Sequence, residues 1–291
     1  MTKTTQTTAT QYADVASWEL SDSLWERIEP LLPQPKSRYR GRGKNRKHIG
    51  GRPAADRRTV MSGILYVMRT GCQWNALPKE FGSGKTAHRY FQRWVRAGVF
   101  KRLWQAGLNE YDDLKGIDWK WQAADGAMTK APLGGEKTGK NPTDRGKIGT
   151  KRSLLVNAQG LPLGIVVSAA NTPDGRLLDA TLHGVPIERP DPATTDQHLC
   201  LDKGYSGEPC ATVAEAAGYT VHVPGQDQRE KKRKRQPGRR KPRRWIVEVA
   251  HSWINRFRRL LVRWEKKASN YLSLLYFACA IICWRKCEVL R

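Results

Sequence analysis

Three acidic residues in the last two-thirds of the chain have the type and setting needed for metal-assisted chemistry. Asp125 and Asp202 each close an apolar run and precede a glycine-containing segment that predicts a turn, whereas Glu248 lies in an amphipathic helical pattern. Carboxylates bind hard divalent cations, and two such cations clamp the attacking and leaving oxygens of a phosphodiester. Together the three residues predict a site for phosphoryl transfer.

Each of these residues also has a simpler explanation. Asp followed by Gly is a common turn signal after a strand, which could account for Asp125 and Asp202 alone. Glu248 lies four residues after Arg244, so the two could form an ordinary ion pair on a solvated helix face. The case for chemistry therefore depends on the three acidic residues being positioned together.

The charge of the chain favours a polyanionic partner. Among 291 residues, 52 are Lys or Arg and 27 are Asp or Glu, which gives a formal net charge of +25. Such a charge repels itself in isolation and favours nucleic acid, on whose bases the 11 tryptophans could stack. The sequence predicts neither a membrane-binding face nor a secretory signal, and the six cysteines show no zinc or disulfide spacing, so a cytoplasmic, nucleoid-associated protein is expected.

The first third of the chain predicts a helical domain over residues 17–113, after a loose tail over residues 1–16. Ser23 and Glu26 match a capping box that would open its first helix. A segment dense in cations, residues 35–53, predicts an extended basic arm. Its expected DNA contacts are Arg42, Lys44 and Arg46.

Two further helices are expected in this domain, one capped by Asp56 and ending at Thr70–Gly71, the other following Ser83–Gly84. The second interleaves cations with apolar residues. Short helices around a glycine-containing turn favour a helix-turn-helix-like unit that contacts DNA, and the alternative is a plain helical bundle with a solvated basic face. The predicted DNA contacts on the second helix are Lys85, Arg89 and Arg93.

Residues 114–291 predict an α/β domain. Two β-rich runs flank Gln159–Gly160, which indicates a hairpin, and the runs ending at Asp125 and Asp202 add strands to a mixed sheet. A basic loop over residues 225–244 is expected to stay extended until phosphate neutralises it. Helices that would cover the sheet are expected at Leu177–Leu182, Ala211–Ala217 and Trp245–Trp264.

The last of these helices carries two lines of residues at helical spacing. The apolar line predicts a face that packs on the sheet and consists of Trp245, Val249, Trp253, Phe257, Leu260 and Trp264. The polar line beside it consists of Arg244, Glu248, His251, Asn255 and Arg259. Glu248 would thus lie at the rim of the buried face, with neighbours able to hold a phosphate.

A nucleotide site is not expected. The run from Gly134 to Lys140 matches the start of a phosphate-binding loop, but Asn141 stands where the Mg²⁺-binding Ser or Thr belongs and Pro142 follows at once.

In order along the chain, these motifs resemble the bacterial insertion-sequence transposases with a DDE catalytic triad. The resemblance rests on Gly51-Arg-Pro, Phe91-Gln-Arg-Trp, Asp125-Gly, the run from Asn141 to Lys151, Ala170-Asn-Thr-Pro-Asp, Asp202-Lys-Gly-Tyr and Arg244-Trp-Ile-Val-Glu. It implies a ribonuclease H-like mixed sheet flanked by helices, an N-terminal all-α domain that binds the element's inverted-repeat ends, and two Mg²⁺ ions, with Mn²⁺ as a substitute.

The resemblance also implies roles for individual residues. Asp125, Asp202 and Glu248 would form the triad and hold the metal ions. The family's C-terminal signature is Tyr, two residues, Arg, three residues, Glu, six residues, Lys; Arg244 and Glu248 match it, whereas Lys241 and Asn255 occupy the Tyr and Lys positions. Around the triad, the expected DNA contacts are Arg244, Asn255, Arg256, Arg259, Lys203, Tyr205, Arg145, Lys147 and Lys151.

The reaction implied is metal-assisted hydrolysis that frees a 3′-OH at each element end, followed by attack of that hydroxyl on target DNA. The implied partners are double-stranded DNA and at least one further copy of the chain when DNA is bound, without a membrane or a nucleotide cofactor. Two alternatives stay open: a catalytically inactive DNA-binding regulator or decayed copy, and a ribonuclease H-type nuclease that does not transpose.

Overall fold

The computed structural model describes residues 19–34, 39–40, 47–48, 50, 53–205, 208–223 and 244–290. The chain divides into two compact units, Met1–Phe91 and Gln92–Arg291. The predicted tail, the arm residues Arg42, Lys44 and Arg46, and the basic loop up to residue 243 lie outside the described residues. The limits of the functional domains, placed at residue 113 from the sequence, stay a prediction.

The first unit contains helices α1 (Asp22–Ile28) and α2 (Arg57–Thr70) and most of α3 (Gly84–Arg96). The predicted capping residue of α1 was wrong: Ser21 precedes the helix, and its hydroxyl accepts a hydrogen bond from the Leu24 amide at 3.3 Å. The predicted cap of α2 is confirmed, because the Asp56 carboxylate accepts one from the Thr59 amide at 2.7 Å.

The connection between α2 and α3 is compact. Gly71 ends α2 in the left-handed conformation, with φ of 77°, and two 3₁₀ turns follow, η3 (Trp74–Ala76) and η4 (Lys79–Phe81). Gly84 lies so close to this connection that an added Cβ would come within 1.7 Å of the Trp74 carbonyl oxygen. Any side chain at position 84 would therefore push the start of α3 away from the turn.

Two short strands, β1 (Tyr39–Arg40) and β2 (Lys47–His48), pair antiparallel in the segment predicted as a basic arm.

The second unit is built on a six-stranded mixed sheet. Its strands are β3 (Trp121–Lys130), β4 (Gly139–Lys140), β5 (Ile148–Asn157), β6 (Pro162–Ala169), β7 (His198–Cys200) and β8 (Thr220–His222). β5 pairs antiparallel with β3, β4 and β6, whereas β7 pairs parallel with both β3 and β8. This order confirms the predicted ribonuclease H-like mixed sheet, and the β5–β6 hairpin turns at the predicted Gln159–Gly160.

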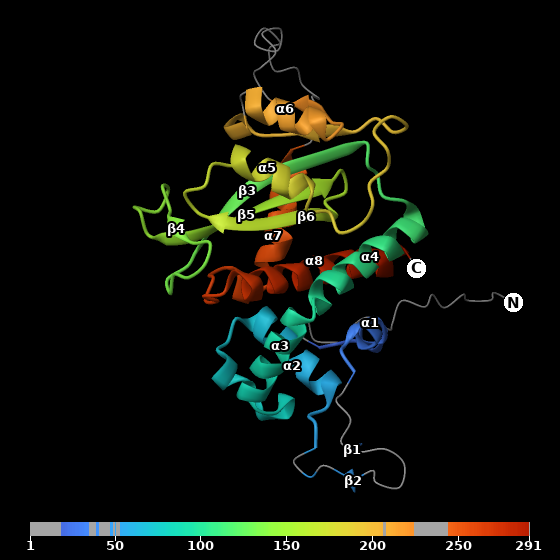
Figure 1. Cartoon of the computed structure of the whole chain (residues 1–291), viewed down its shortest axis with the longest axis vertical. Helices are drawn as coiled ribbons and strands as arrows, with labels where there is room; N and C mark the ends of the chain where they lie inside the picture. Colours follow the sequence, from blue (N-terminus) through green and yellow to red (C-terminus); the bar gives the residue numbers. More distant parts are fainter. Residues whose placement is uncertain are drawn as a thin grey trace, which may run out of the picture. The chain divides into compact units, whose positions relative to one another are not determined.

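Helices cover both faces of this sheet (Figure 1). The helices α5 (Gly175–Leu182) and α6 (Glu208–Ala216) lie on one side, and α7 (Trp245–Asn255) lies on the other. Helix α4 (Val99–Lys115) packs along α8 (Ala268–Leu290), with the Phe100 and Phe277 rings 5.3 Å apart. Cys279, Cys283 and Cys287 lie buried on α8, as their spacing predicts. Among the described residues, no helix is long and apolar enough to cross a membrane.

Two local predictions were wrong. The last covering helix ends at Asn255 rather than Trp264, and its buried side chains are Val247, Ala250, His251 and Ile254. Of the predicted apolar line, only Phe257 and Leu260, which follow the helix, are buried. Trp245 is 45% exposed. Asp125–Gly126 does not form a turn either, because β3 continues through both residues to Lys130.

Candidate active site

Asp125 lies within β3, and Asp202 follows the end of the neighbouring strand β7. In the parallel β3–β7 pair, Ala123 is the register partner of Cys200. Asp125 lies two residues beyond Ala123, and Asp202 lies two residues beyond Cys200. Because side chains alternate between faces along a strand and neighbouring strands lie about 4.8 Å apart, Asp125 projects from the same face of β3 as Ala123, and the segment that carries Asp202 continues from β7 beside it.

This face is the one that α7 covers. Asp125 and Ala127 share a face of β3, and Ala127 is the register partner of Arg152 on β5. The Arg152 guanidinium in turn donates hydrogen bonds to His251 and Asn255 of α7. Glu248 lies in the first turn of that helix, so all three acidic residues belong to the same side of the sheet.

Arg244 links the second and third acidic residues. Its guanidinium lies 3.5 Å from a carboxylate oxygen of Asp202 and 3.2 Å from one of Glu248. The side chains of Asp202 and Glu248 are 45% and 57% exposed, and that of Arg244 is 26% exposed. The expected Arg244–Glu248 ion pair therefore exists, but it extends to Asp202 and so brings the ends of β7 and α7 together.

The third carboxyl group, that of Asp125, is half-buried. The pKa of Asp125 is raised to about 6, chiefly by burial and to a smaller extent by the charges of Asp202 and Asp174, whereas the Gly126 amide and Arg244 act in the opposite direction. Within the described part of the chain, Asp125 has no ion-pair partner within 4 Å. A carboxylate in this position, with no cation close by, would be stabilised by a bound cation.

Buried hydrogen bonds between polar side chains hold helix α7 to the sheet. Arg152 is 2% exposed, and its guanidinium donates to His251 Nδ1 at 3.3 Å and to Asn255 Oδ1 at 2.6 Å. Burial, followed by the Arg152 charge, lowers the pKa of His251 to about 3, although a contact with the Asp125 backbone acts the other way. His251 is thus neutral at pH 7 and couples the helix that carries Glu248 to the strand that carries Asp125.

The opposite face of the same strands carries a second polar cluster. Lys151 Nζ lies 3.0 Å from Asp174 Oδ1, and both residues pack against Gly126. Tyr205 is 2% exposed, and burial, followed by the negative charge of Asp174, raises the pKa of its hydroxyl. Lys151 and Tyr205 were predicted as DNA contacts and lie buried beneath the acidic residues. Asp174 was not singled out, although the motif Ala170-Asn-Thr-Pro-Asp marks its position.

The remaining predicted DNA contacts fall into two groups. Arg259 is buried against Glu265, with 2.8 Å between the guanidinium and the carboxylate. Arg93 is half-buried on α3. Exposed side chains belong to Lys85, Arg89, Arg145, Lys147, Lys203, Asn255 and Arg256.

Arg145 and Lys147 lie in a tight turn before β5, where Arg145 has φ of 50° and Gly146 has φ of 72°. The Asn141 carbonyl accepts the Gly146 amide at 3.0 Å, which closes this turn. The turn thus presents two cations that the sequence pattern singled out.

The donor chemistry of the acidic residues fits a divalent cation, but their present geometry does not assemble a full set of ligands. Among the residues that the structure describes, no three His, Cys, Asp or Glu side chains lie close enough to hold a metal ion. Arg244 supplies the positive charge between Asp202 and Glu248 instead. A cation held by Asp202 and Glu248 would therefore compete with their ion pairs to Arg244.

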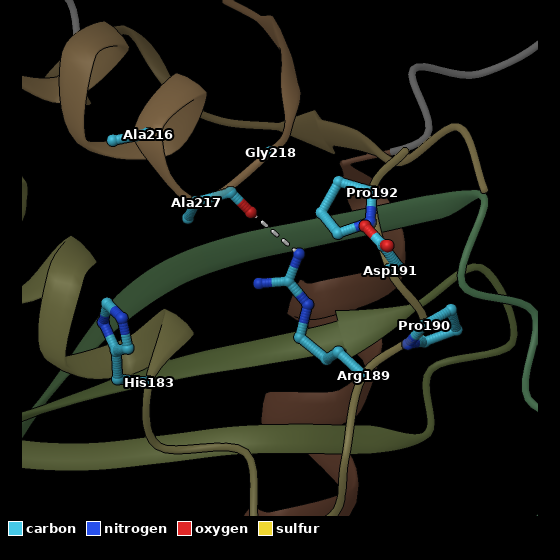
Figure 2. Close-up of a pocket in the computed structure, with 8 residues that line it drawn as sticks. All are labelled: His183, Arg189, Pro190, Asp191, Pro192, Ala216, Ala217 and Gly218. Atoms are coloured by element: carbon cyan, nitrogen blue, oxygen red, sulfur yellow. Dashed lines mark hydrogen bonds between the residues drawn. The ribbon is translucent and has the colours of Figure 1, made fainter. Parts of the chain in front are cut away.

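A separate pocket of about 450 Å³ lies at the other end of the parallel strands. Figure 2 shows Arg189 extending across it, where its guanidinium donates to the Ala217 carbonyl at 3.0 Å. The same guanidinium bonds to Gln197, which precedes β7, and lies 4.2 Å from the Tyr219 ring centre. None of the predicted site residues lines this pocket, and its arginine ties the loop before β7 to α6.

Two family models match the chain. Residues 20–104 match the model described as a putative transposase of IS4/5 family. Residues 120–283, more than half of the chain, match the model described as a transposase DDE domain. The second match includes all three acidic residues.

Similar proteins include two from Burkholderia cepacia. A putative transposase for insertion sequence element IS402 is 32% identical over 160 residues, covering 52% of this chain and 70% of the relative. The insertion element IS402 uncharacterized 16.2 kDa protein is 39% identical over 125 residues, covering 42% and 80%. The crystal structure of the catalytic domain of Mos1 mariner transposase superposes with a TM-score of 0.27 and 10% identity, covering 68% of this chain and 93% of that one.

Proposed function

The chain belongs to the DDE transposase family, and on that premise we propose that it binds the terminal inverted repeats of an insertion sequence and cuts and joins DNA with Asp125, Asp202 and Glu248. Membership of this family implies DNA as the substrate and a divalent metal ion as the cofactor. The finer assignment is two Mg²⁺ ions, replaceable by Mn²⁺, and a location with bacterial chromosomal DNA.

One observation carries the assignment of the acidic residues. Asp125 lies on β3, Asp202 follows the adjacent parallel strand β7 by two residues, and Arg244 connects Asp202 to Glu248 on the helix above the same face. Three carboxylates from a strand, the end of its neighbour and one helix thereby lie on one side of the sheet. Bound metal ions would activate the attacking oxygen and stabilise the leaving oxygen.

The protein's own residues have separate tasks in this proposal. The carboxylates of Asp125, Asp202 and Glu248 position the cations, and no side chain acts as a nucleophile. Arg244 neutralises Asp202 and Glu248 in the absence of metal. It then turns to a DNA phosphate, to which a guanidinium can donate two hydrogen bonds.

DNA binding is proposed to involve both units, each through its own cations. On α3, Lys85 and Arg89 are exposed one turn apart, as expected for a helix that contacts DNA. In the second unit, Arg145 and Lys147 occupy the turn before β5, and Arg256 follows α7. Because two element ends must be joined, at least a homodimer on DNA is proposed.

The test is strand cleavage of a labelled duplex carrying the inverted repeats that flank this gene. Wild type, Asp202→Ala and Glu248→Gln are compared with Mg²⁺, with Mn²⁺ and with EDTA. We expect metal-dependent nicking at the repeat boundary, reduced about a thousandfold or more in each variant, with binding to the repeats nearly unchanged.

Other outcomes of this experiment point elsewhere. Binding of the repeats without nicking in any metal would indicate the DNA-binding regulator. Nicking that survives both substitutions would retain the enzyme and reject these acidic residues. Cleavage of an RNA–DNA hybrid without any terminal sequence would indicate the ribonuclease H-type nuclease.

A further inference from the structure

We propose that Lys151, Asp174 and Tyr205 form a positioning cluster that fixes Asp125 and Asp202 relative to each other from the opposite face of the sheet. This inference rests on the proposed function, because it assigns the cluster to the carboxylates that would hold metal. None of the three residues is proposed to contact DNA or metal.

The first observation is that Asp174 does not perform the usual task of its position. It is the N-cap residue of α5, but its side chain makes no capping hydrogen bond. The carboxylate turns instead toward the sheet, where Oδ1 lies 3.0 Å from Lys151 Nζ. The Lys151 side chain is only 7% exposed, so this pair is largely withdrawn from solvent.

The second observation is the contact between Asp174 and the strand that carries Asp125. A Cβ added to Gly126 would lie 2.0 Å from Asp174 Oδ1 and 3.4 Å from Lys151 Cδ. The ion pair therefore fills the space that any larger residue at position 126 would need. As a result, the backbone next to Asp125 rests directly on the Asp174 carboxylate.

The third observation connects the same cluster to Asp202. Tyr205 follows Asp202 by three residues, and its amide donates to the Asp202 carbonyl at 3.0 Å. Its ring is buried, and burial, followed by the nearby Asp174 charge, raises the pKa of its phenol. Within the described residues, the Tyr205 hydroxyl has no hydrogen bond of ordinary geometry, so the ring itself fixes the turn. Tyr205 thus anchors the turn after β7 in the core, close enough to Asp174 for the two groups to interact electrostatically.

These contacts make the cluster a common support for both carboxylates. Asp125 is tied to it through Gly126 and Asp202 through Tyr205, while Lys151 neutralises the Asp174 charge on the far side of the sheet from the site. Divalent ions need oxygen ligands at well-defined separations, and groups that orient the ligands affect metal affinity. Loosening the cluster should therefore weaken metal use before it weakens DNA binding.

The test uses the full chain and the inverted-repeat duplex. For Asp174→Asn and Tyr205→Leu, the second of which removes the buried ring, the Mg²⁺ concentration for half-maximal cleavage and the dissociation constant for the repeat duplex are measured. A second readout is Mn²⁺ binding to the protein–DNA complex, followed by electron paramagnetic resonance. We expect each variant to need about 10-fold more metal in both assays, while duplex affinity stays within about twofold.

The matched control is Thr181→Val. The Thr181 hydroxyl is buried on the same face and donates to the Ser153 hydroxyl at 2.8 Å. This variant should lower the thermal midpoint without changing the metal requirement. High Mn²⁺ should restore the maximal rate of Asp174→Asn, which keeps the shape of the side chain and is expected to fold normally.

The outcomes separate this inference from the function on which it rests. If Asp202→Ala is inactive while Asp174→Asn and Tyr205→Leu follow the wild-type metal titrations, the cluster is only structural and the inference is wrong. The inference is equally wrong if their metal requirement changes no more than that of Thr181→Val. If Asp202→Ala cleaves like wild type, the assignment of the acidic residues fails first.

Discussion

The two faces of the central sheet give a buried cationic side chain different kinds of partner. Lys151 and Arg152 are consecutive on β5 and both are buried, but they project to opposite faces. Lys151 meets the carboxylate of Asp174, whereas Arg152 meets the neutral acceptors of His251 and Asn255.

This difference shows where the molecule keeps negative charge available. On the α5 face, the Asp174 carboxylate is committed to an ion pair. On the α7 face, the helix is attached through neutral groups, so the buried Arg152 does not bind Asp125 or Glu248. In the described part of the chain, Asp202 and Glu248 have only the partly exposed Arg244 as an ion-pair partner, and Asp125 has none. In the proposed function, Arg244 leaves these carboxylates for a DNA phosphate.

The largest expected effect concerns His251 at acid pH. Its folded-state pKa of about 3 lies below the usual 6.5, so the folded protein holds the neutral form. Its contribution to stability is present above pH 6.5 and is lost as the pH falls toward 3, by up to about 5 kcal/mol at 1.36 kcal/mol per unit. His251→Gln should therefore be less acid-sensitive than wild type. Urea unfolding at pH 7 and pH 4 measures this, and parallel losses in both proteins would contradict it.

The next effect compares the two cations directly. Lys151→Met and Arg152→Met should each lower the free energy of unfolding by about 3 kcal/mol, because each leaves buried polar partners unsatisfied. Adding Asp174→Asn should recover much of the loss in Lys151→Met. Adding His251→Gln should not rescue Arg152→Met, since that partner is already neutral. Denaturant unfolding of the four proteins provides the measurement, and equal rescue on both faces would remove the distinction.

The sequence predicts much of this arrangement, but not which side chains lie on which face of the sheet. Apolar runs and the Gln159–Gly160 turn are local signals, and they predict the hairpin and the strands. The apolar line of α7 was misplaced because Trp253 does not cover the sheet. Its ring lies 3.0 Å from where a Cβ of Gly160 would be, on the hairpin turn, and Lys286 lies 4.7 Å from the ring centre. Small Ala250 lies buried instead.

The position of Asp125 within its strand has a similar cause. Asp-Gly predicts a turn on local grounds, but Gly126 serves here to admit the side chain of Asp174 from α5. That contact joins residues 48 positions apart in sequence, so no local pattern contains it. Asp174 itself could be found only as part of a motif.

A smaller effect is expected for Asp125→Asn. The pKa of Asp125 is raised to about 6, so the folded protein favours its protonated form, and the stability due to that form is lost as pH rises from about 4 through 6. Without metal at pH 8, the variant should be more stable than wild type by about 1–2 kcal/mol, below the full linkage value because solvent screens part of the carboxyl. Thermal unfolding in EDTA tests this.

Adding Mn²⁺ extends the same experiment. Wild type should gain stability on adding the ion, because a ligand that binds only the folded state stabilises it, and Asp125→Asn should gain less. If wild type is instead more stable than Asp125→Asn in EDTA at pH 8, then Asp125 has a cationic partner that interacts with it more strongly than Arg244 does.

The smallest effect concerns Asn255, which is exposed yet accepts a 2.6 Å hydrogen bond from Arg152. Asn255→Ala should cost about 1 kcal/mol, because Arg152 keeps its bond to His251 and the vacated position is open to water. The family signature predicts a DNA contact at this position, whereas the geometry gives Asn255 a structural partner. Unfolding and repeat-duplex affinity, measured on the same variant, separate these roles. A stability loss with unchanged affinity leaves Asn255 as part of the neutral attachment of α7, whereas weaker DNA binding at unchanged stability shows that this attachment also reaches the substrate.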